Sequence, residues 1–538
     1  MSDDMVYGID LGTTYSAIAR LDQYGKPEAI ENSDGQYTTP SVVLFEEGSE
    51  RYVVGLEAKN ESAINPDRVV QWVKRFMGIE GWTTEIDGRE WTPEEVSAII
   101  LKRLASDAAA KIGSPVENVV ITVPAYFDDV ARTATRTAGK IAGLNVIEVL
   151  NEPTAAALYY SVMSPDADLT GDILVYDLGG GTFDVTVITV SGDAVTVIAT
   201  GGRRELGGKD WDDRLVTYVA EQFNLVHGID PLDDPIALQE LRIRAEEAKR
   251  SLSSRDAVRV AVSAGGARDS VEVTREKFDE ITLDLLQNTI QLTNELLEKA
   301  TEKGHSSLSE ILLVGGSSKM PQVEEAVKQA LGSQPRLFEP DMAVAKGAAL
   351  WAAKRWVDQK VIDELGSDAS EQEVEEVTQR FAAEVGLPAA LVVKRVGDVL
   401  SHSVGVVVED QNRPGVMVVS RLLAAQTPID QATASGEFGT SADGQTDVRI
   451  TIVQGEDDDP TQCTQVGEGT LSWGVPVPRN SPIEITFSMS GEGIIVVTGM
   501  DKTYGNATTF ELERVSAMSA DEIQAATNVV SALRARGE

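Results

Sequence analysis

The chain has 538 residues, of which 42% are hydrophobic and 25% charged, so it is a globular protein too long for one hydrophobic core. Its 47 basic and 86 acidic residues give a formal net charge of −39, which argues against nucleic acid or an anionic membrane surface as a partner. A single cysteine, Cys463, excludes an internal disulfide and fits a reducing compartment. The first residues lack the apolar core of a signal peptide, and no apolar run reaches the ~18 residues of a membrane span, so we expect a cytoplasmic protein.

The first two thirds of the chain alternate short β-branched runs with long helical segments, a pattern typical of an α/β domain. The runs that predict strands are residues 6–9, 41–45, 119–123, 172–176, 182–190 and 311–314. The segments that predict helices are residues 92–112, 128–143, 209–226, 235–252, 275–303 and 320–331.

One motif occurs twice in this region. Gly8-Ile-Asp-Leu-Gly-Thr-Thr14 resembles Tyr176-Asp-Leu-Gly-Gly-Gly-Thr-Phe-Asp184, and each copy includes the end of a predicted strand. Two copies of one strand–turn–strand unit predict a duplicated fold with a cleft between the copies.

Beyond residue 357 the pattern changes. An acidic helical segment follows, in which Ser370 and Glu373 match a capping box and Gly386 ends the helix. After it, β-branched runs separated by Gly, Asp, Asn and Pro predict an all-β sandwich, and Ser519 begins a last short helix. The expected segments are an α/β domain at 1–357, a helical insert and linker at 358–403, a β-sandwich at 404–515 and a C-terminal helix at 516–538.

Glycine-rich turns after strands can bring backbone N–H groups close to phosphate oxygens. The segments 12–14 and 179–182 are two such turns, and they follow Asp10 and Asp177. A triphosphate arrives with Mg²⁺, which takes carboxylate oxygens and keeps several waters. If both aspartates merely capped local turns, two like charges would face each other across the cleft at a cost. The sequence therefore favours a site for Mg²⁺ and phosphate.

Two charged residues have roles that the pattern leaves open. Lys74 lies on a predicted helix between bulky apolar residues, where a surface lysine with a buried stem is the alternative to a functional one. Glu152 precedes a proline at the start of a predicted helix and is either a helix cap or a site residue.

Two segments could hold a nucleoside. Residues 315–321 lie between a strand and a helix and would let a nucleoside lie against the backbone. Residues 246–253 present Glu246, Lys249, Arg250 and Ser253 on one helix face, which fits ribose hydroxyls or a solvated charged surface equally well.

Together these motifs resemble the seventy-kilodalton heat-shock chaperone family of the bacterial DnaK type. The resemblance implies an α/β fold with a duplicated actin-like, ribonuclease-H-like ATPase domain, then a helical insert and an all-β sandwich. The segments that carry it are residues 9–16, 38–41, 121–127, 151–157, 177–184, 206–208 and 314–317.

The resemblance implies roles for the residues of the cleft. Asp10 and Asp177 would hold the waters of Mg²⁺, and Asp184 would help to bind K⁺. Lys74 would position the attacking water, with Glu152, Asp177, Thr182 and Asp10 in the same catalytic network. Residues that would contact ATP or ADP are Gly12, Thr13, Thr14, Tyr15, Gly179, Gly180, Gly181, Gly208, Glu246, Lys249, Arg250, Ser253, Gly315, Gly316, Ser317, Lys319 and Asp341.

The sandwich resembles the peptide-binding domain of the family more loosely. Pro124 and Arg132 match a switch that reports the nucleotide state to this domain. The implied partners are unfolded or extended polypeptides and co-chaperones of the J-domain and nucleotide-exchange types. Residues that would line an apolar peptide pocket, or else form the sandwich core, are Val406, Val408, Phe438, Val448 and Ile450.

The chain also departs from the family pattern. Lys319 replaces an arginine that stacks on adenine, and Lys209 replaces an acidic residue beside the phosphate loop. The interdomain linker is reduced to residues 398–400, and the segment 358–395 is an addition. Because the chain ends after one short helix, we expect no helical lid, and therefore fast peptide exchange with modest affinity.

Three functions fit these observations. The first is an ATP-dependent chaperone that hydrolyses ATP to control the binding of extended apolar segments. The alternative is a nucleotide-gated adaptor that binds one dedicated protein. The third, a small-molecule kinase on the same duplicated fold, would need a substrate base and no sandwich.

Overall fold

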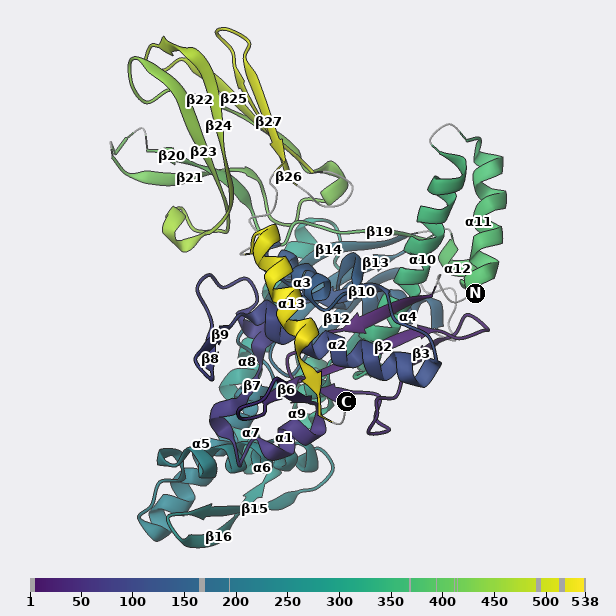
Figure 1. Cartoon of the computed structure of the whole chain (residues 1–538), viewed down its shortest axis with the longest axis vertical. Coiled ribbons are helices and arrows are strands. Elements are labelled where there is room, and N and C mark those ends of the chain that lie inside the picture. Colours follow the sequence, from purple (N-terminus) through teal and green to yellow (C-terminus); the bar gives the residue numbers. More distant parts are fainter. Residues whose placement is uncertain are drawn as a thin grey trace.

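The computed structural model describes residues 5–163, 170–192, 194–366, 369–392, 394–410, 412–413, 415–489, 495–511 and 518–536. The boundary predicted at residues 515 and 516 lies outside these ranges. A large α/β body carries an all-β domain at one end (Figure 1). No helix in the described ranges is both long and apolar enough to span a membrane.

Two six-stranded β-sheets with a similar plan are the largest sheets of the α/β body within the described residues, which also include three smaller sheets. In each sheet, one central strand pairs antiparallel with the strand that follows it in the chain and parallel with a different strand on its opposite edge. This similarity confirms the predicted duplication. The first sheet contains β11 (Asn145–Asn151), β10 (Asn118–Val123), β1 (Val6–Asp10), β2 (Tyr15–Leu21), β3 (Pro27–Ala29) and β4 (Thr39–Pro40). The second contains β18 (Arg336–Leu337), β17 (Leu308–Val314), β12 (Gly171–Leu178), β13 (Phe183–Val190), β14 (Ala194–Arg203) and β19 (Arg395–Gly397).

We call the part of the body around the first sheet the first lobe, and the part around the second sheet the second lobe. The helices of the first lobe are α1 (Leu56–Glu61), α2 (Pro93–Ile112) and α3 (Asp129–Ile141). Those of the second are α5 (Gly208–His227), α6 (Pro235–Leu252), α7 (Arg275–Ile281), α8 (Leu283–Glu302) and α9 (Pro321–Leu331). The helix predicted at 275–303 is therefore two helices, which meet at Thr282.

Two helices, α4 (Glu152–Met163) and α10 (Ala343–Leu365), pack against each other and against strands of the first sheet. A Cβ atom added to Gly347 of α10 would lie 1.8 Å from the carbonyl oxygen of Ala155 in α4. A Cβ atom added to Gly8 of β1 would lie 2.1 Å from the backbone nitrogen of Ala349 in α10. Because backbone meets backbone at both positions, these glycines set the spacing between α10, α4 and the strand that ends at Asp10.

The segment predicted as an insert packs on the α/β body. The predicted boundary at residue 357 falls inside α10, which continues to Leu365. The helix α11 (Glu371–Val385) begins at Ser370 with the predicted capping box and ends at Gly386, and α12 (Ala389–Val392) follows. Phe381 of α11 contacts Trp356 of α10 edge to face, with ring centroids 5.8 Å apart. The strand β19 then adds in parallel to β14, so residues 395–397 belong to the second sheet and residues 398–403 lead from it to the sandwich.

The all-β domain is the predicted sandwich. Its apolar core contains Val404, Ile452, Leu471, Phe487 and Val497, all less than 1% exposed. One sheet, among the described residues, contains β21 (Met417–Leu423), β20 (Val404–Glu409), β23 (Gln445–Gln454) and β24 (Thr464–Val477). The other contains β22 (Thr433–Gly439), β25 (Pro482–Met489), β26 (Ile495–Asp501) and β27 (Ala507–Glu511).

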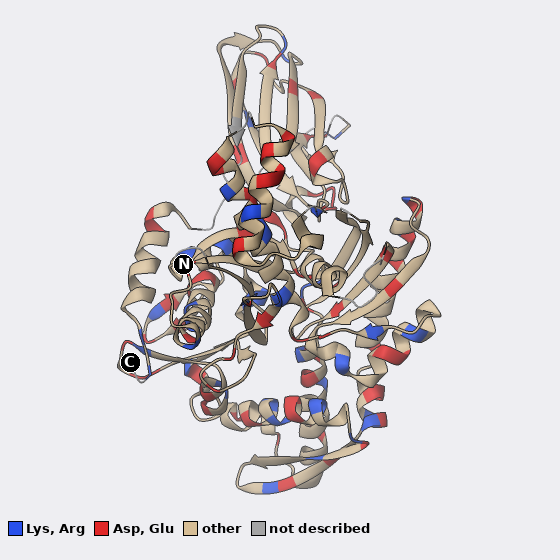
Figure 2. Cartoon of the chain, turned by 90° about the vertical axis from the view of Figure 1, so that its right-hand side faces the viewer, with Lys and Arg blue, Asp and Glu red and all other residues tan. Residues whose placement is uncertain are grey.

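The last helix, α13 (Ala520–Ala532), begins at Ser519 as predicted but lies on the first lobe, beside α2 and α3 (Figure 1). Ala526 and Val530 are buried in the apolar core of that lobe. The strand β28 (Arg534–Ala535) pairs with β6 (Arg51–Val54), and Arg536 forms ion pairs with three glutamates there. In the view of Figure 2 acidic positions are spread over both domains, with basic positions scattered among them.

Candidate functional site

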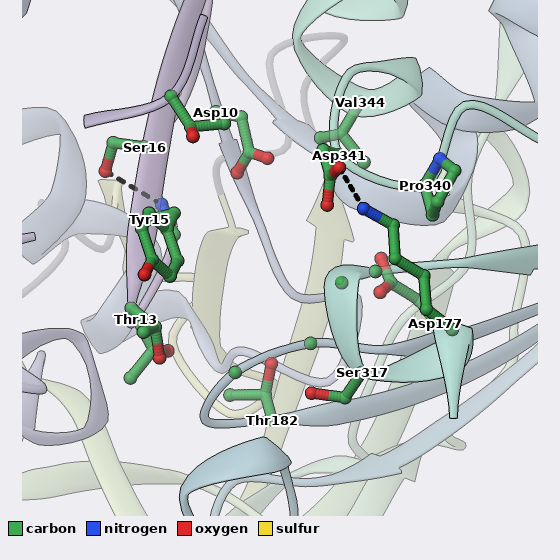
Figure 3. A pocket seen from close by; sticks show the side chains of 18 of the residues that line it. Asp10, Thr13, Tyr15, Ser16, Asp177, Thr182, Ser317, Pro340, Asp341 and Val344 are labelled. Atoms are coloured by element: carbon green, nitrogen blue, oxygen red, sulfur yellow. Dashed lines mark hydrogen bonds and ion pairs between the residues drawn. The ribbon is translucent and has the colours of Figure 1, made fainter. Parts of the chain in front are cut away.

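A cavity of about 320 Å³ lies between the two lobes. Figure 3 shows Asp10 and Tyr15 on one side of it and Asp177 and Ser317 on the other. Most of the predicted cleft residues line it: Asp10, Gly12, Thr13, Thr14, Tyr15, Lys74, Glu152, Asp177, Gly179, Gly180, Thr182, Glu246, Lys249, Arg250, Ser253, Gly315, Gly316, Ser317, Lys319 and Asp341. Three predicted residues, Gly181, Gly208 and Asp184, lie next to these positions without lining the cavity.

The two glycine-rich turns approach each other across the cleft. A Cβ atom added to Gly180 would lie 2.1 Å from the Oγ1 atom of Thr14, and one added to Gly181 would lie 2.2 Å from the Cγ2 atom of Thr13. Only glycine fits at this separation. The turns therefore present backbone N–H groups and threonine hydroxyls to one small volume, which suits an anion with several oxygens.

Three carboxyl groups lie at the ends of the central strands, those of Asp177 and Asp184 buried and that of Asp10 partly buried. Burial, reinforced by the charge of Glu152, raises the pKa of Asp10 to about 7 and the pKa values of Asp177 and Asp184 well above their ordinary range. Asp184 accepts a hydrogen bond of 2.9 Å from the backbone N–H of Ala125. Such a concentration of carboxylates is stable as charged groups only beside a cation.

The carboxyl groups fit a hard cation that keeps water in its shell. Within the described ranges, no three acidic, histidine or cysteine side chains converge closely enough to ligate a metal ion together. Mg²⁺ commonly binds through one or two carboxylates, with waters and phosphate oxygens completing its octahedron. Asp10 and Asp177, which face the cavity from different lobes, suit that mode of binding.

Lys74 and Glu152 form an ion pair inside the cleft. Lys74 lies on a short 3₁₀ helix (Val73–Phe76) and is 3% exposed, so it is not a surface lysine. Glu152 is the first residue of α4 and is also buried. Arg75, which follows Lys74 in the chain, reaches the second lobe. Its Nε donates to the carbonyl oxygen of Gly181 at 2.9 Å, and its guanidinium pairs with Asp210.

The other end of the cavity is held by ion pairs around α6. Glu246 accepts a hydrogen bond of 2.8 Å from the Tyr15 hydroxyl and pairs with Lys59 of the first lobe at 2.6 Å. Lys249 pairs with Asp212 at 2.8 Å, while Arg250 is exposed. This face of α6 is therefore a wall of the cleft, with Arg250 as its exposed residue.

Two residues of this wall were missed from the sequence. Lys59 reaches Glu246 only because the lobes face each other, a proximity that no spacing in the chain reveals. Asp212 could have been found, because it lies one helical turn after Gly208, the first residue of α5. Burial raises the pKa of Asp212 to about 7. The other lining residues missed are Ser16, Ala17, Thr38, Met320, Pro340 and Val344.

Lys319 pairs with Asp341, and Figure 3 draws this contact at the rim of the cavity. Both side chains are between 40% and 45% exposed. The ammonium group of Lys319 is therefore engaged by a carboxylate, whereas a planar guanidinium could stack on a base at the same time.

The predicted switch residue Arg132 lies on a hydrogen-bonded route from the cleft to the sandwich. Its guanidinium donates to the side-chain oxygen of Asn151 and, at 3.1 Å, to the carbonyl oxygen of Val149. The Nδ2 atom of Asn151 donates to Asp398, which precedes the sandwich, at 2.5 Å. Asn151 directly precedes Glu152, so the ion pair of Lys74 is connected to the linker through adjacent residues.

The sandwich contacts the first lobe next to this route. The backbone N–H of Asp129 donates to the Oε1 atom of Gln454 at 3.1 Å, and Val130 packs against the sandwich core. Pro124, the other predicted switch residue, accepts at its carbonyl oxygen from the N–H of Phe127 in the turn before α3. Ser401 donates to the carbonyl oxygen of Ala125 at 2.6 Å within the same turn.

The five predicted peptide-pocket residues divide into two groups. Val406 and Ile450 are 2% and 1% exposed and belong to the sandwich core. Val408, Phe438 and Val448 are partly buried and keep some accessible surface. The apolar surface available to a peptide is therefore smaller than the sequence suggested.

Comparisons of the sequence with known proteins identify the family. The family model for the Hsp70 protein matches residues 6–368 and 393–536. The chain belongs to the Hsp70 family. It is 38% identical over 531 residues to the chaperone protein DnaK of two strains of Halobacterium salinarum, R1 and NRC-1, and the match covers 97% of this chain and 77% of each relative. The family model leaves residues 369–392 unmatched, and these include α11 and α12, whereas it matches the two ends of the segment 358–395 that was expected to be an addition.

Proposed function

We propose that this Hsp70 protein binds ATP with Mg²⁺ in the cleft and hydrolyses it to ADP and phosphate. The observation that carries the proposal is the buried pair of Lys74 and Glu152 in one cavity with Asp10 and Asp177. When bound, Mg²⁺ supplies charge neutralisation at the phosphates. Asp10 and Asp177 would hold its waters, and Asp184, which pairs in register with Asp177 on the neighbouring strand, is the residue we assign to K⁺.

Different residues of the cleft bind the nucleotide and catalyse its hydrolysis. The backbone N–H groups and hydroxyls of residues 12–15 and 179–182 bind the phosphates. Lys74 orients the attacking water and stabilises negative charge that develops on the γ-phosphate, while Glu152 fixes the position of Lys74. The α6 face and residues 315–319 hold the adenosine.

We further propose that hydrolysis controls the binding of extended apolar polypeptide segments to the sandwich. The route from Glu152 through Asn151 to Asp398 supports this coupling, because it joins the catalytic ion pair to the residue that precedes the sandwich. The edge strand β22 can add main-chain hydrogen bonds to an extended segment. J-domain and nucleotide-exchange proteins are the co-chaperones that such a cycle would use, and the cytoplasm is the proposed compartment.

A specific observation favours the adaptor as the second candidate. Two of the five pocket residues are committed to the core, and Glu409, which is exposed, stands at the end of β20 beside the remaining apolar surface. A smaller, partly charged surface suits one dedicated partner better than many unfolded ones.

Product analysis and client assays together test the proposal. Incubation with Mg²⁺ and ATP should release phosphate without any phosphorylated small molecule, and a phosphorylated product would indicate a kinase instead. The chaperone should also suppress aggregation of several unrelated unfolded proteins. Phosphate release without such protection would exclude the general chaperone and favour the nucleotide-gated adaptor.

Binding of Mg²⁺ and ADP should release protons. With its pKa near 7, Asp10 carries a proton at pH 6, and a cation requires the ionised carboxylate. The affinity for Mg²⁺ and ADP should therefore rise as the pH is raised from 6 through 7. Calorimetry at pH 6 in two buffers of different ionisation enthalpy gives the number of protons released. Asp10→Asn at saturating Mg²⁺ should release fewer protons, and equal numbers would contradict the account.

Phe438→Ser should weaken the binding of a labelled extended apolar peptide. Loss of one partly buried aromatic contact corresponds to about 1–2 kcal/mol, or roughly 5- to 30-fold in Kd. The thermal midpoint of the sandwich should change little. Val406→Ala is the matched control, because truncation of a core side chain should lower the thermal midpoint of the sandwich. Unchanged peptide affinity in folded Phe438→Ser would exclude this surface as the binding site.

A further inference from the structure

We propose that Trp72 acts as a clasp between the lobes that retains bound nucleotide, by placing its indole ring against two cations of the opposite lobe, Lys209 and Arg242. The inference rests on the proposed nucleotide site and adds to it a residue that controls release. Trp72 is not among the described residues that line the main cavity.

The ring of Trp72 faces both cations across the cleft. The Nζ atom of Lys209, on α5, lies 4.8 Å from the ring centroid, and the Cζ atom of Arg242, on α6, lies 5.7 Å from it. Both distances are within the ~6 Å at which a cation is attracted to the face of an aromatic ring, and tryptophan is the strongest such acceptor. Trp72 follows β7 (Val69–Gln71) of the first lobe, so opening of the cleft must separate the ring from both charges.

The two cations differ in their other contacts. Lys209 also pairs with Asp213 one turn along its own helix, so it is shared between the carboxylate and the ring. The Nε atom of Arg242 is buried and has no hydrogen-bond partner among the described residues. The indole face thus supplies an electrostatic contact for a guanidinium whose Nε makes no hydrogen bond.

The backbone of Trp72 is unusual in a way that supports a functional position. Its φ of 57° and ψ of 22° lie in the left-handed region, which a bulky residue adopts only where its surroundings impose it. The next four residues, Val73–Phe76, form the 3₁₀ turn that carries Lys74 toward Glu152 and Arg75 toward Gly181. Trp72 and Arg75 therefore both contact the second lobe, one on either side of Lys74 in the sequence.

The clasp lies directly beside the phosphate-binding turn. Trp72 lines a small second pocket together with Thr13 and Thr14, and with the interlobe pair of Lys59 and Glu246. Because the ring stands outside the main cavity, its removal should change how readily the lobes separate and leave the reacting groups in place.

The release rate of a fluorescent ADP, measured by stopped flow with an excess of ATP, tests the inference in the full-length chain. Trp72→Leu keeps an apolar side chain and removes the aromatic face. It should speed ADP release about 3- to 30-fold, the range expected for one or two cation–π contacts. Hydrolysis in a single turnover should stay within about twofold of the unaltered chain, and Trp72→Phe should restore part of the slow release.

A double-mutant cycle identifies the partners. Lys209→Met and Arg242→Met should each speed release in the unaltered background and have little effect in Trp72→Leu. Trp82→Leu is the control, because Trp82 stacks on Phe76 within the first lobe, with ring centroids 4.3 Å apart, and should leave release unchanged.

Two outcomes would overturn the inference, and they differ from failure of the proposed function. ADP release at the normal rate in Trp72→Leu would contradict the proposed role of Trp72 but not the proposed nucleotide site. Equal effects of the two methionine substitutions in both backgrounds would do the same. If the unaltered chain binds no ADP, the proposed function fails and the clasp fails with it.

Discussion

Lys74→Ala is expected to lower the rate of ATP hydrolysis by about 100-fold or more while leaving nucleotide affinity within a few-fold. Removal of one preorganised group that stabilises developing charge typically costs 10²–10³-fold in turnover. The phosphates keep the backbone groups of both glycine-rich turns, so binding should survive. Single-turnover phosphate release and calorimetric titration with ADP measure the two quantities separately.

A matched control separates catalysis from the loss of a buried ion pair. Lys354 is 9% exposed and pairs with Asp358 on α10, away from the cavity. Lys354→Ala should leave turnover unchanged. The double variant Lys74→Ala, Glu152→Gln removes the unpaired charge that the single variant leaves behind, and should restore stability without activity. Normal turnover in Lys74→Ala would show that its assigned role is wrong.

Gly347→Ala is expected to destabilise the α/β body, against the direction that helix propensity predicts. Alanine is favoured over glycine inside a helix by about 1 kcal/mol. Here its methyl group would meet the carbonyl oxygen of Ala155 at 1.8 Å, and forced separation of α10 from α4 should cost about 1–3 kcal/mol or more. The unfolding midpoint of the body in urea should fall, and ATP turnover should fall with it because α10 also supports β1.

Gly192 provides the control for this substitution. A Cβ atom added there meets no heavy atom within 4 Å, so Gly192→Ala should leave the midpoint nearly unchanged. A higher unfolding midpoint for Gly347→Ala would contradict this prediction. It would mean that α10 and α4 move apart at little cost in free energy and that Gly347 does not set their spacing.

The motif repeat made much of the fold and cleft predictable. Two strand–turn–strand units placed Asp10 and Asp177 at equivalent positions, and the family resemblance added Lys74 and Glu152. The strands and turns were predictable because they depend on local sequence: strands show β-branched runs, and close turns need glycine. The catalytic and metal-binding roles assigned to the four residues stay predictions.

Features that depend on contacts between distant segments could not be predicted in this way. Lys59 looks like any surface lysine until α6 is placed opposite it. The left-handed backbone of Trp72 has no local signal, because glycine or asparagine is the usual residue there. The apolar face of α13 predicts that the helix packs on something, but its position on the first lobe follows from partners more than 400 residues away, such as Lys102, which donates to the carbonyl oxygen of Val530.

The most direct test of the central claim is the rate of phosphate release from Mg²⁺ and ATP as an extended apolar peptide is titrated into the full chain. If the cleft hydrolyses ATP and is coupled to the sandwich through Asn151 and Asp398, phosphate should appear in step with ADP and its rate should rise to a plateau with peptide. No phosphate release, or a rate that the peptide leaves unchanged at every concentration, would contradict the account.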